Sequence, residues 1–358
     1  MNREELRTLS VGENIDRLVT LDMRGYGVPR ILYEAARRRC GESVCLHMAK
    51  TLDAHLCDGN YIFLTTGFVF EPHKKGELDG FTGTALLIRA MLHIAEVKPV
   101  LFCEEQLVSA AEQVLAAAGV EVYSSINEVA QYPHACAVVG ISNDQETAQT
   151  QCEQILAETE PAAIIAVEKP GRNEKGIYHQ GTGIDVSGLC AKVDDLFTAC
   201  AARGVPTFAI GDLGNEIGMG AIRETICSKI PLGDRCVCGC GGGICVETEA
   251  DCLAVATTSD WACYGIISAL ALLHQDLGLI PTPELERKVC LRANEAGLID
   301  GSGWVIPSID GIELESNVLL LQMLRESVRY PLETGDAYGR LYDMVLEKNS
   351  FDEEREVQ

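Results

Sequence analysis

Short apolar runs alternate with segments of helical periodicity along most of the chain. The runs are rich in Val, Ile, Leu and aromatic residues, which is typical of buried strands; they lie at 61–68, 97–103, 120–123, 135–141, 162–167, 207–210 and 252–256. Periodic segments between them predict helices, among others at 84–95, 144–158 and 194–203. Because strands separated by helices pair in parallel, the pattern predicts an α/β fold, with a mostly parallel sheet and helices on both faces in three layers.

The two ends of the chain have a different pattern. Residues 1–55 show helical periodicity around a Gly-Tyr-Gly-Val-Pro break, which predicts a helical N-terminal annex, and residues 346–358 form a charged tail. We find no low-complexity linker and no repeat of fixed period. The expected organisation is a single domain over 1–345, with the annex at 1–55 and the core at 56–345.

A glycine-rich loop follows the predicted strand 207–210. It reads Gly211-Asp-Leu-Gly-Asn-Glu-Ile-Gly-Met-Gly220, so Asp212, Asn215 and Glu216 stand among four glycines. Glycine lets a backbone approach a ligand closely, and ligands of open α/β sheets bind beyond the carboxyl ends of the strands. The loop therefore predicts two carboxylates and an amide presented at a strand end. The alternative is a surface turn with solvated acids.

Other acidic residues stand in glycine-flanked loops or at the ends of predicted strands. They are Glu77, Asp79, Glu168, Asp185, Asp251 and Asp300. In a parallel sheet several of these ends meet at one edge, and clustered carboxylate oxygens suit Mg²⁺ or Mn²⁺. Without a cation such a cluster would raise the pKa values of its members. Each acid could instead be a separate solvated loop residue.

The net charge and the absence of complete nucleotide-binding motifs limit the kinds of partner and cofactor that the sequence predicts. The chain has 29 Lys and Arg against 53 Asp and Glu, a net charge of −24, which argues against nucleic acid and anionic membranes as partners. No P-loop occurs, and Gly239–Gly243 matches a dinucleotide loop only in part, so we expect no nucleotide cofactor. Lys169, Arg172 and Arg223 could clamp a substrate carboxylate or form surface ion pairs.

The sequence contains 16 cysteines but no apolar signal at its start and no transmembrane run, which favours a reducing, cytoplasmic location. Cys236, Cys238, Cys240 and Cys245 are close together in the sequence, but their spacing matches none of the usual metal-ligand runs. On a strand the first three would also share one face. We therefore interpret them as buried or unliganded thiols, and His179 as a solvated loop histidine.

Between residues 60 and 330 a series of short motifs occurs in a fixed order: Thr66-Gly-Phe, Gly76-Glu-Leu-Asp-Gly80, Glu168-Lys-Pro-Gly-Arg172, Gly183-Ile-Asp185, the loop 211–220, Ser259-Asp-Trp261, Asp300-Gly301 and Asp310-Gly311. Taken together, these motifs resemble the D-glutamate cyclase family. The run Gly214-Asn-Glu-Ile-Gly-Met-Gly220 is the most specific of these. Asp260 stands where the family has Asn. The cysteine cluster is not part of the pattern.

The resemblance implies conversion of a small amino acid, D-glutamate, to 5-oxo-D-proline and water. We expect a divalent cation, Mg²⁺ or Mn²⁺, to be held by residues from the set Glu168, Asp185, Asp212 and Glu216, and Asp212 to take part in catalysis. Glu216 or Glu77 would be the general base. Substrate contacts are expected from Arg172 or the helix start at 80–84, with the residues Gly80, Asp79, Thr84 and Asn215.

Two other functions remain open on the sequence alone. The same acidic centre would suit a metal-dependent phosphohydrolase, and the chain could also be a non-catalytic protein that binds a small metabolite or nucleotide. The sequence leaves a homo-oligomer open as well.

Overall fold

Seven parallel strands form the central sheet of the part of the chain that the computed structural model describes, residues 1–334 and 337–348. Their order is β5(Glu121–Tyr123), β6(Ala135–Ile141), β4(Lys98–Glu104), β1(Tyr61–Thr65), β7(Pro161–Val167), β8(Thr207–Gly211) and β9(Cys252–Val255). The predicted α/β fold with a parallel sheet is thus confirmed. All seven predicted runs are strands, and most of their side chains are buried because helices cover both faces.

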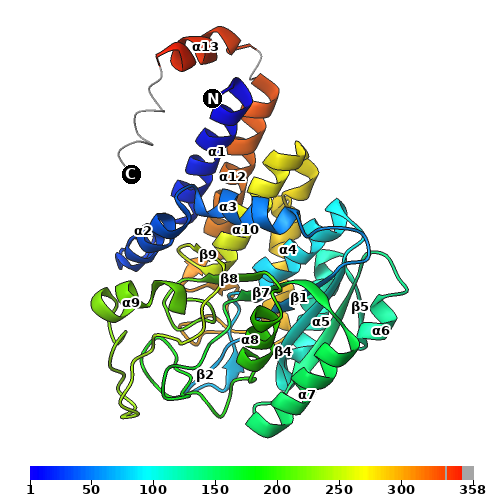
Figure 1. Ribbon diagram of the computed structural model, residues 1–358, viewed down its shortest axis with the longest axis vertical. Coiled ribbons are helices and arrows are strands. Elements are labelled where there is room, and N and C mark those ends of the chain that lie inside the picture. Colours follow the sequence, from blue (N-terminus) through cyan, green and yellow to red (C-terminus); the bar gives the residue numbers. More distant parts are fainter. Residues whose placement is uncertain (335–336, 349–358) are drawn as a thin grey trace.

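Two groups of helices flank the sheet, as Figure 1 shows. The helices α4(Phe81–Ile94), α5(Val108–Ala118), α10(Ser259–His274) and α11(Pro283–Glu295) pack on one another, and α7(Gln145–Glu158) packs on α8(Asp194–Ala202). Connections between parallel strands are right-handed. The connections through α4 and α5 run along the sheet in one direction and those through α7 and α8 run in the other, so these two pairs of helices lie on opposite faces of the sheet. The shorter α6(Ile126–Val129) packs on the strands at the β5 end of the sheet, and α9(Arg223–Lys229) packs on α2(Val28–Cys40).

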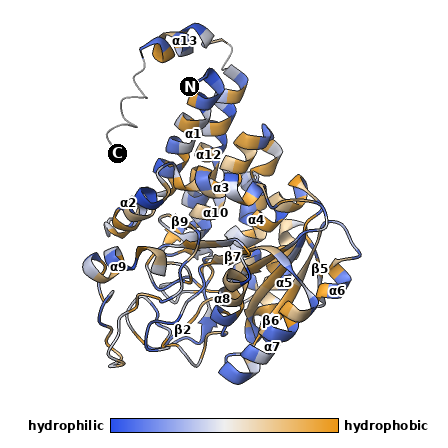
Figure 2. Ribbon diagram, in the orientation of Figure 1, coloured by the Kyte–Doolittle hydropathy of each residue, from blue (hydrophilic) through white to orange (hydrophobic). Residues whose placement is uncertain are grey.

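The predicted helical annex consists of α1(Arg3–Val19), α2(Val28–Cys40) and α3(Val44–Asp53). It packs on α10 and, through α1, on the long C-terminal helix α12(Leu314–Thr334), so the two ends of the chain lie side by side (Figure 1). Beyond them, α13(Gly339–Glu347) extends into the predicted charged tail, whose residues from 349 onward lie outside the described part. Figure 2 shows the apolar strands between more polar outer helices such as α7.

The direction in which successive strands are added to the sheet reverses at its middle. The crossovers from β1 lead toward β4, whereas those from β7 lead toward β8 and β9, and β1 and β7 are neighbours. Ligands of open α/β sheets bind in the crevice beyond such a switch point. The segments at this end of the sheet contain two short hairpins. One pairs β2(Val69–Phe70) with β3(Lys75–Gly76), and the other pairs β10(Ser308–Ile309) with β11(Ile312–Glu313). No helix among the described residues is long and apolar enough to cross a membrane.

Candidate active site

A cavity of about 470 Å³ opens at the switch point. Glu168 follows β7 directly and Asp212 follows β8, while Glu77 comes from the segment after β1. These three carboxylates line the cavity together with Asn215 and with Asp310. The volume is in the range of small-molecule sites. The prediction that acids at strand ends meet at one edge is confirmed for this set.

Two of the lining acids adopt left-handed backbone conformations. The φ angle of Glu168 is 45° and that of Asp310 is 52°. Residues with a Cβ rarely adopt positive φ, and such strained positions gather at functional sites. The turn at Glu168 carries its carboxylate toward α10, where Oε2 accepts a hydrogen bond of 2.6 Å from the hydroxyl of Ser259.

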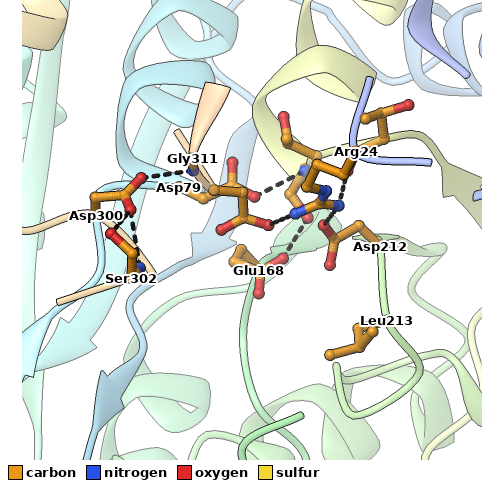
Figure 3. A network of polar contacts seen from close by, with 12 residues as sticks. Arg24, Asp79, Glu168, Asp212, Leu213, Asp300, Ser302 and Gly311 are labelled. Carbon is orange, nitrogen blue, oxygen red and sulfur yellow. Dashed lines mark hydrogen bonds and ion pairs between the residues drawn. The ribbon is translucent and has the colours of Figure 1, made fainter. Parts of the chain in front are cut away.

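Arg24 brings a positive charge into this acidic cavity from the connection between α1 and α2. Its guanidinium lies 2.5 Å from Asp310 and 3.3 Å from Asp212, and it also donates to the carbonyl of Thr257 (Figure 3). Thr257 in turn donates from its backbone N–H to Val19 and from its hydroxyl to Leu21. The annex is thereby tied to the end of β9, and this connection places Arg24.

Asp79 and Asp260 cap each other's helices. The carboxylate of Asp79 accepts from the backbone N–H groups of Ser259 and Asp260 at the start of α10, at 2.9 and 2.8 Å. Asp260 Oδ1 accepts from the N–H groups of Gly80 and Gly83 at the start of α4, at 3.0 and 2.6 Å. Carboxylates at helix N-termini satisfy otherwise unpaired donors. The anion site predicted at residues 80–84 is thus filled by the protein itself.

This finding corrects the predicted substrate contacts at Gly80 and Thr84. The helix α4 begins at Phe81, so Thr84 lies inside the helix rather than at its cap, and neither residue lines the cavity. Asp79 does not line it either, although one of its oxygens lies within 4.8 Å of ligand atoms of Asp212 and Asp310. Gly80 has φ 85°, and a Cβ there would lie 2.6 Å from the side chain of Glu168.

Glu216 stabilises the loop after β8 from within. Its Oε1 accepts from the N–H groups of Asp212 and Leu213 at 3.1 and 2.9 Å, and its Oε2 accepts from Gly214 at 2.7 Å. The side chain is fully buried and does not line the cavity. One of its oxygens still lies within 4.8 Å of ligand atoms of Glu168 and Asp212. The geometry assigns Glu216 to positioning Asp212, and it is less suited to the predicted role of general base.

Burial and mutual repulsion favour protons on these acids. Burial, followed by the charge of Asp310, raises the pKa of Glu77 well above its usual value, and burial, followed by Glu168, does the same for Asp212. The pKa of Glu168 is raised by burial and by Glu216. Arg24 counteracts this at Asp212 by favouring the ionised form. The cavity therefore holds carboxyl groups whose protonated forms are favoured more strongly than those of solvated acids.

Burial also raises the pKa of Asp79, to about 7, although its three backbone donors act in the opposite direction. Asp300 differs from these acids, because hydrogen bonds from Ser302, Ser308 and Gly311 outweigh its burial and lower its pKa. These bonds fold the segment that carries Asp310, as Figure 3 shows for Ser302 and Gly311. Asp300 thus shapes the site without lining the cavity.

The structure places three further predicted acids and cations away from the cavity. Asp185 is exposed and accepts from the N–H of Ser187, apart from the other predicted metal ligands. Arg172 pairs with Asp195 at 2.9 Å in a different hollow, so it does not meet the predicted substrate position. Asp251 accepts from Thr207 at the opposite, amino-terminal edge of the sheet. These expectations are corrected because the sequence does not show which way each loop turns.

The other predicted cations are also engaged elsewhere. Lys169 is completely buried and its ammonium group pairs with Glu104 and donates to the carbonyl of Gly67 at 2.9 Å. Arg223 pairs with Glu174 at 3.0 Å. Sequence reasoning did not identify Arg24 as a site residue, because nothing near it in the sequence signals a long-range ion pair. Asp310 was recognised only as part of an Asp-Gly pair.

Within the described part of the chain, two residues that line the cavity each have a buried polar atom without a hydrogen-bond partner. One is the donor Nε of Arg24, and the other is the acceptor Oδ1 of Asn215, whose Nδ2 donates to the carbonyl of His179 at 3.0 Å. Both residues line the cavity. Unpaired buried polar atoms are costly, so a ligand that satisfies both would bind favourably. A carboxylate matches the donor, and an ammonium group matches the acceptor.

The fold and the cavity define an α/β protein with a small-ligand site at the switch point of a parallel sheet. Residues 15–325 match the family model "D-glutamate cyclase-like, C-terminal", and the chain therefore belongs to this family. It is also similar to human D-glutamate cyclase, mitochondrial, with 32% identity over 112 residues. That alignment covers 31% of this chain and 17% of the human protein.

Proposed function

We propose that the protein is a lyase that converts D-glutamate to 5-oxo-D-proline and water in the acidic cavity. The observation that carries the proposal is the pairing of an unpartnered donor on Arg24 with an unpartnered acceptor on Asn215, beside carboxyl groups of raised pKa. This arrangement is complementary to an amino acid. Membership of the D-glutamate cyclase-like family supports glutamate as that amino acid.

The reaction moves protons from nitrogen to oxygen. A C–N bond forms between the α-nitrogen and the γ-carboxyl carbon, a C–O bond breaks, and the ammonium group gives up two protons while the γ-carboxylate takes up two to leave as water. Glu77, whose pKa is raised, is suited to hold a proton for the departing oxygen. Asp212 lines the cavity beside Arg24 and in its ionised form would accept one from the ammonium group; burial and then Glu168 raise its pKa, and Arg24 acts in the opposite direction.

Binding accounts for the remaining roles. Arg24 would hold the γ-carboxylate of the substrate and Asn215 would accept a hydrogen bond from its α-nitrogen. The two reacting ends of one molecule are thereby brought together. Such orientation supplies much of the acceleration of an intramolecular reaction. The apolar side chains of Phe68 and Phe70 line the same cavity.

The donor chemistry of the site fits a divalent cation. Two groups of three carboxylates, Asp79, Asp212 and Asp310 and also Glu168, Asp212 and Glu216, have ligand oxygens within 4.8 Å of one another, and the charges of Asp310 and Asp79 also act on Glu77. Arg24 pairs with two of these acids, Asp212 and Asp310. Oxygen-only sets suit Mg²⁺ or Mn²⁺. Glu168 and Asp212 would hold the ion; once bound, it would polarise the γ-carboxylate as a Lewis acid.

The test is chiral chromatography of D- and L-glutamate incubated with the protein, with Mn²⁺ or with EDTA. We expect 5-oxo-D-proline from the D isomer alone, with less product in EDTA. Asp212→Asn should lower kcat/KM by roughly 100-fold or more, the usual scale for losing a general acid or base. Asp185→Asn is the matched control, since Asp185 is exposed and apart from the cavity, and it should keep full activity.

Other results would decide against the proposal. An Asp212→Asn variant with full activity and full metal content would remove Asp212 from the mechanism. Release of phosphate from phosphoesters would favour a phosphohydrolase, and saturable binding of glutamate without turnover would favour a binding protein.

A further inference from the structure

Three cysteines and one histidine converge beside the cavity, at a place that the proposed reaction does not use. Cys236 Sγ lies 3.1 Å from Cys238 Sγ and 3.4 Å from Cys240 Sγ. His179 Nε2 lies 3.3 Å from Cys238 Sγ and 3.7 Å from Cys240 Sγ. The four ligand atoms all lie within 4.8 Å of one another.

The backbone explains how alternate cysteines meet. The segment 236–243 is a series of bends rather than a strand, and Gly239 and Gly241 have φ angles of 86° and 85°. These left-handed turns bring the three sulfur atoms to one point, which a strand would not do. His179 is 1% exposed, so the expectation of a solvated histidine is wrong.

The chemistry of the four atoms is that of a closed zinc site. Three thiolates and an imidazole are a common ligand set for structural zinc, and ligands about 2.0 to 2.3 Å from the ion in a tetrahedron stand roughly 3.5 to 3.8 Å apart. The observed separations approach these values, while they are far from a disulfide bond of about 2.05 Å. We propose that Cys236, Cys238, Cys240 and His179 bind a structural zinc ion.

Donors around the sulfur atoms support the proposal. The backbone N–H of Gly242 lies 3.4 Å from Cys240 Sγ, and Nδ2 of Asn173 lies 3.6 Å from it. Donors of this kind are the usual outer partners of a metal-bound thiolate, because they stabilise its charge. Asn173 also donates to the carbonyl of Gly243 at 2.8 Å, which fixes the turn. Cys238 is exposed and leaves a path for the ion to enter.

The ion would join the cysteine loop to one wall of the cavity. His179 precedes Gln180, Gly181 and Thr182, which line the cavity, and its carbonyl accepts the hydrogen bond from Asn215. Zinc at His179 would therefore hold this wall and the amide of Asn215 in place. The zinc site would have a structural role and would take no part in the reaction.

Metal analysis of the purified full-length chain tests the proposal directly. We expect about one zinc ion per chain, and for protein reloaded with Co²⁺ the intense visible and near-ultraviolet absorption of tetrahedral cobalt thiolate. Cys238→Ser removes one ligand at an exposed position and should lose both signals, whereas Cys238→His keeps a donor and should retain metal. Cys57→Ser, an exposed cysteine elsewhere, is the matched control and should be unchanged.

Hydrogen exchange tests the zinc site independently of the carboxylate site and of catalytic activity. Zinc removal or Cys238→Ser should increase exchange in 178–183 and 232–246 and leave the sheet protected. Zinc-free native protein with no cobalt spectrum, a disulfide between two of the three cysteines, or iron with inorganic sulfide would each overturn the proposal. A zinc content that Cys238→Ser does not change would overturn it as well.

Discussion

The buried carboxyl group of Glu286 should make the protein less stable as the pH rises. Glu286 lies on α11 and its Oε1 accepts a hydrogen bond of 2.6 Å from the hydroxyl of Tyr264 on α10, while Oε2 has no partner among the described residues. The residue is completely buried. Burial raises its pKa from 4.5 to about 7, although the bond from Tyr264 acts in the opposite direction.

The size and sign of the effect follow from proton linkage. Between pH 4.5 and about 7 the unfolded chain has lost the Glu286 proton and the folded protein keeps it. The free energy of unfolding therefore falls as the pH rises through this window and levels off above the folded pKa. The difference between the two pKa values is worth about 3 kcal/mol, since one pH unit corresponds to about 1.4 kcal/mol.

Glu286→Gln removes the titration and keeps the acceptor for Tyr264. Urea unfolding, followed by fluorescence of the buried Trp261, gives the free energy of unfolding at a series of pH values. Relative to the native protein, the variant should gain about 3 kcal/mol between about pH 4.5 and pH 8. Glu284→Gln makes the same chemical change at an exposed position of α11 and is the control. A difference for Glu286→Gln that stays constant over this range would refute the reasoning.

Two further predictions concern the site. Arg24→Lys should lower kcat/KM for D-glutamate about 30-fold, because a lost hydrogen bond to a charged group costs about 2 kcal/mol, and Arg172→Lys should leave steady-state turnover unchanged. Equal losses in the two variants would contradict the assignment of Arg24. Gly80→Ala should lower the free energy of unfolding by more than Gly59→Ala does, since both have φ above 80° but only Gly80 would place a Cβ against Glu168. Urea unfolding of the two variants measures the difference between their losses of unfolding free energy. Equal losses would show that the side chain of Glu168 moves aside without a cost in stability.

Hydrophobic patterning predicted the sheet well because its strands are buried on both faces. Such strands are unbroken apolar runs, and 135–141 was predicted with the bounds of β6. Helix α11 was not predicted, since nearly half of its residues are charged and only one stripe, with Val289 and Cys290, is buried. Acids placed directly after strands, Glu168 and Asp212, were located correctly because the end of a parallel strand fixes their edge of the sheet.

Residues whose position depends on long-range partners could not be predicted in the same way. The start of α4 was expected to bind an anion, but its backbone N–H groups donate to the carboxyl group of Asp260 from a distant segment. Arg172 follows a strand end closely, yet its side chain pairs with Asp195 away from the cavity. The three cysteines meet only because two glycines bend a segment that has no regular structure.

The role of the annex follows from the same reasoning about partners. Residues 1–55 were expected to be an accessory to the core, yet Arg24 from this segment supplies the guanidinium that pairs with Asp212 and Asp310. Removing it would leave the buried acids without that partner, and burial and mutual repulsion would then favour their protonated forms more strongly. A protonated Asp212 could no longer accept a proton from the substrate. In the proposed reaction the annex is therefore part of the active site, and its attachment at Thr257 fixes the position of Arg24, whose charge opposes the rise in the pKa of Asp212.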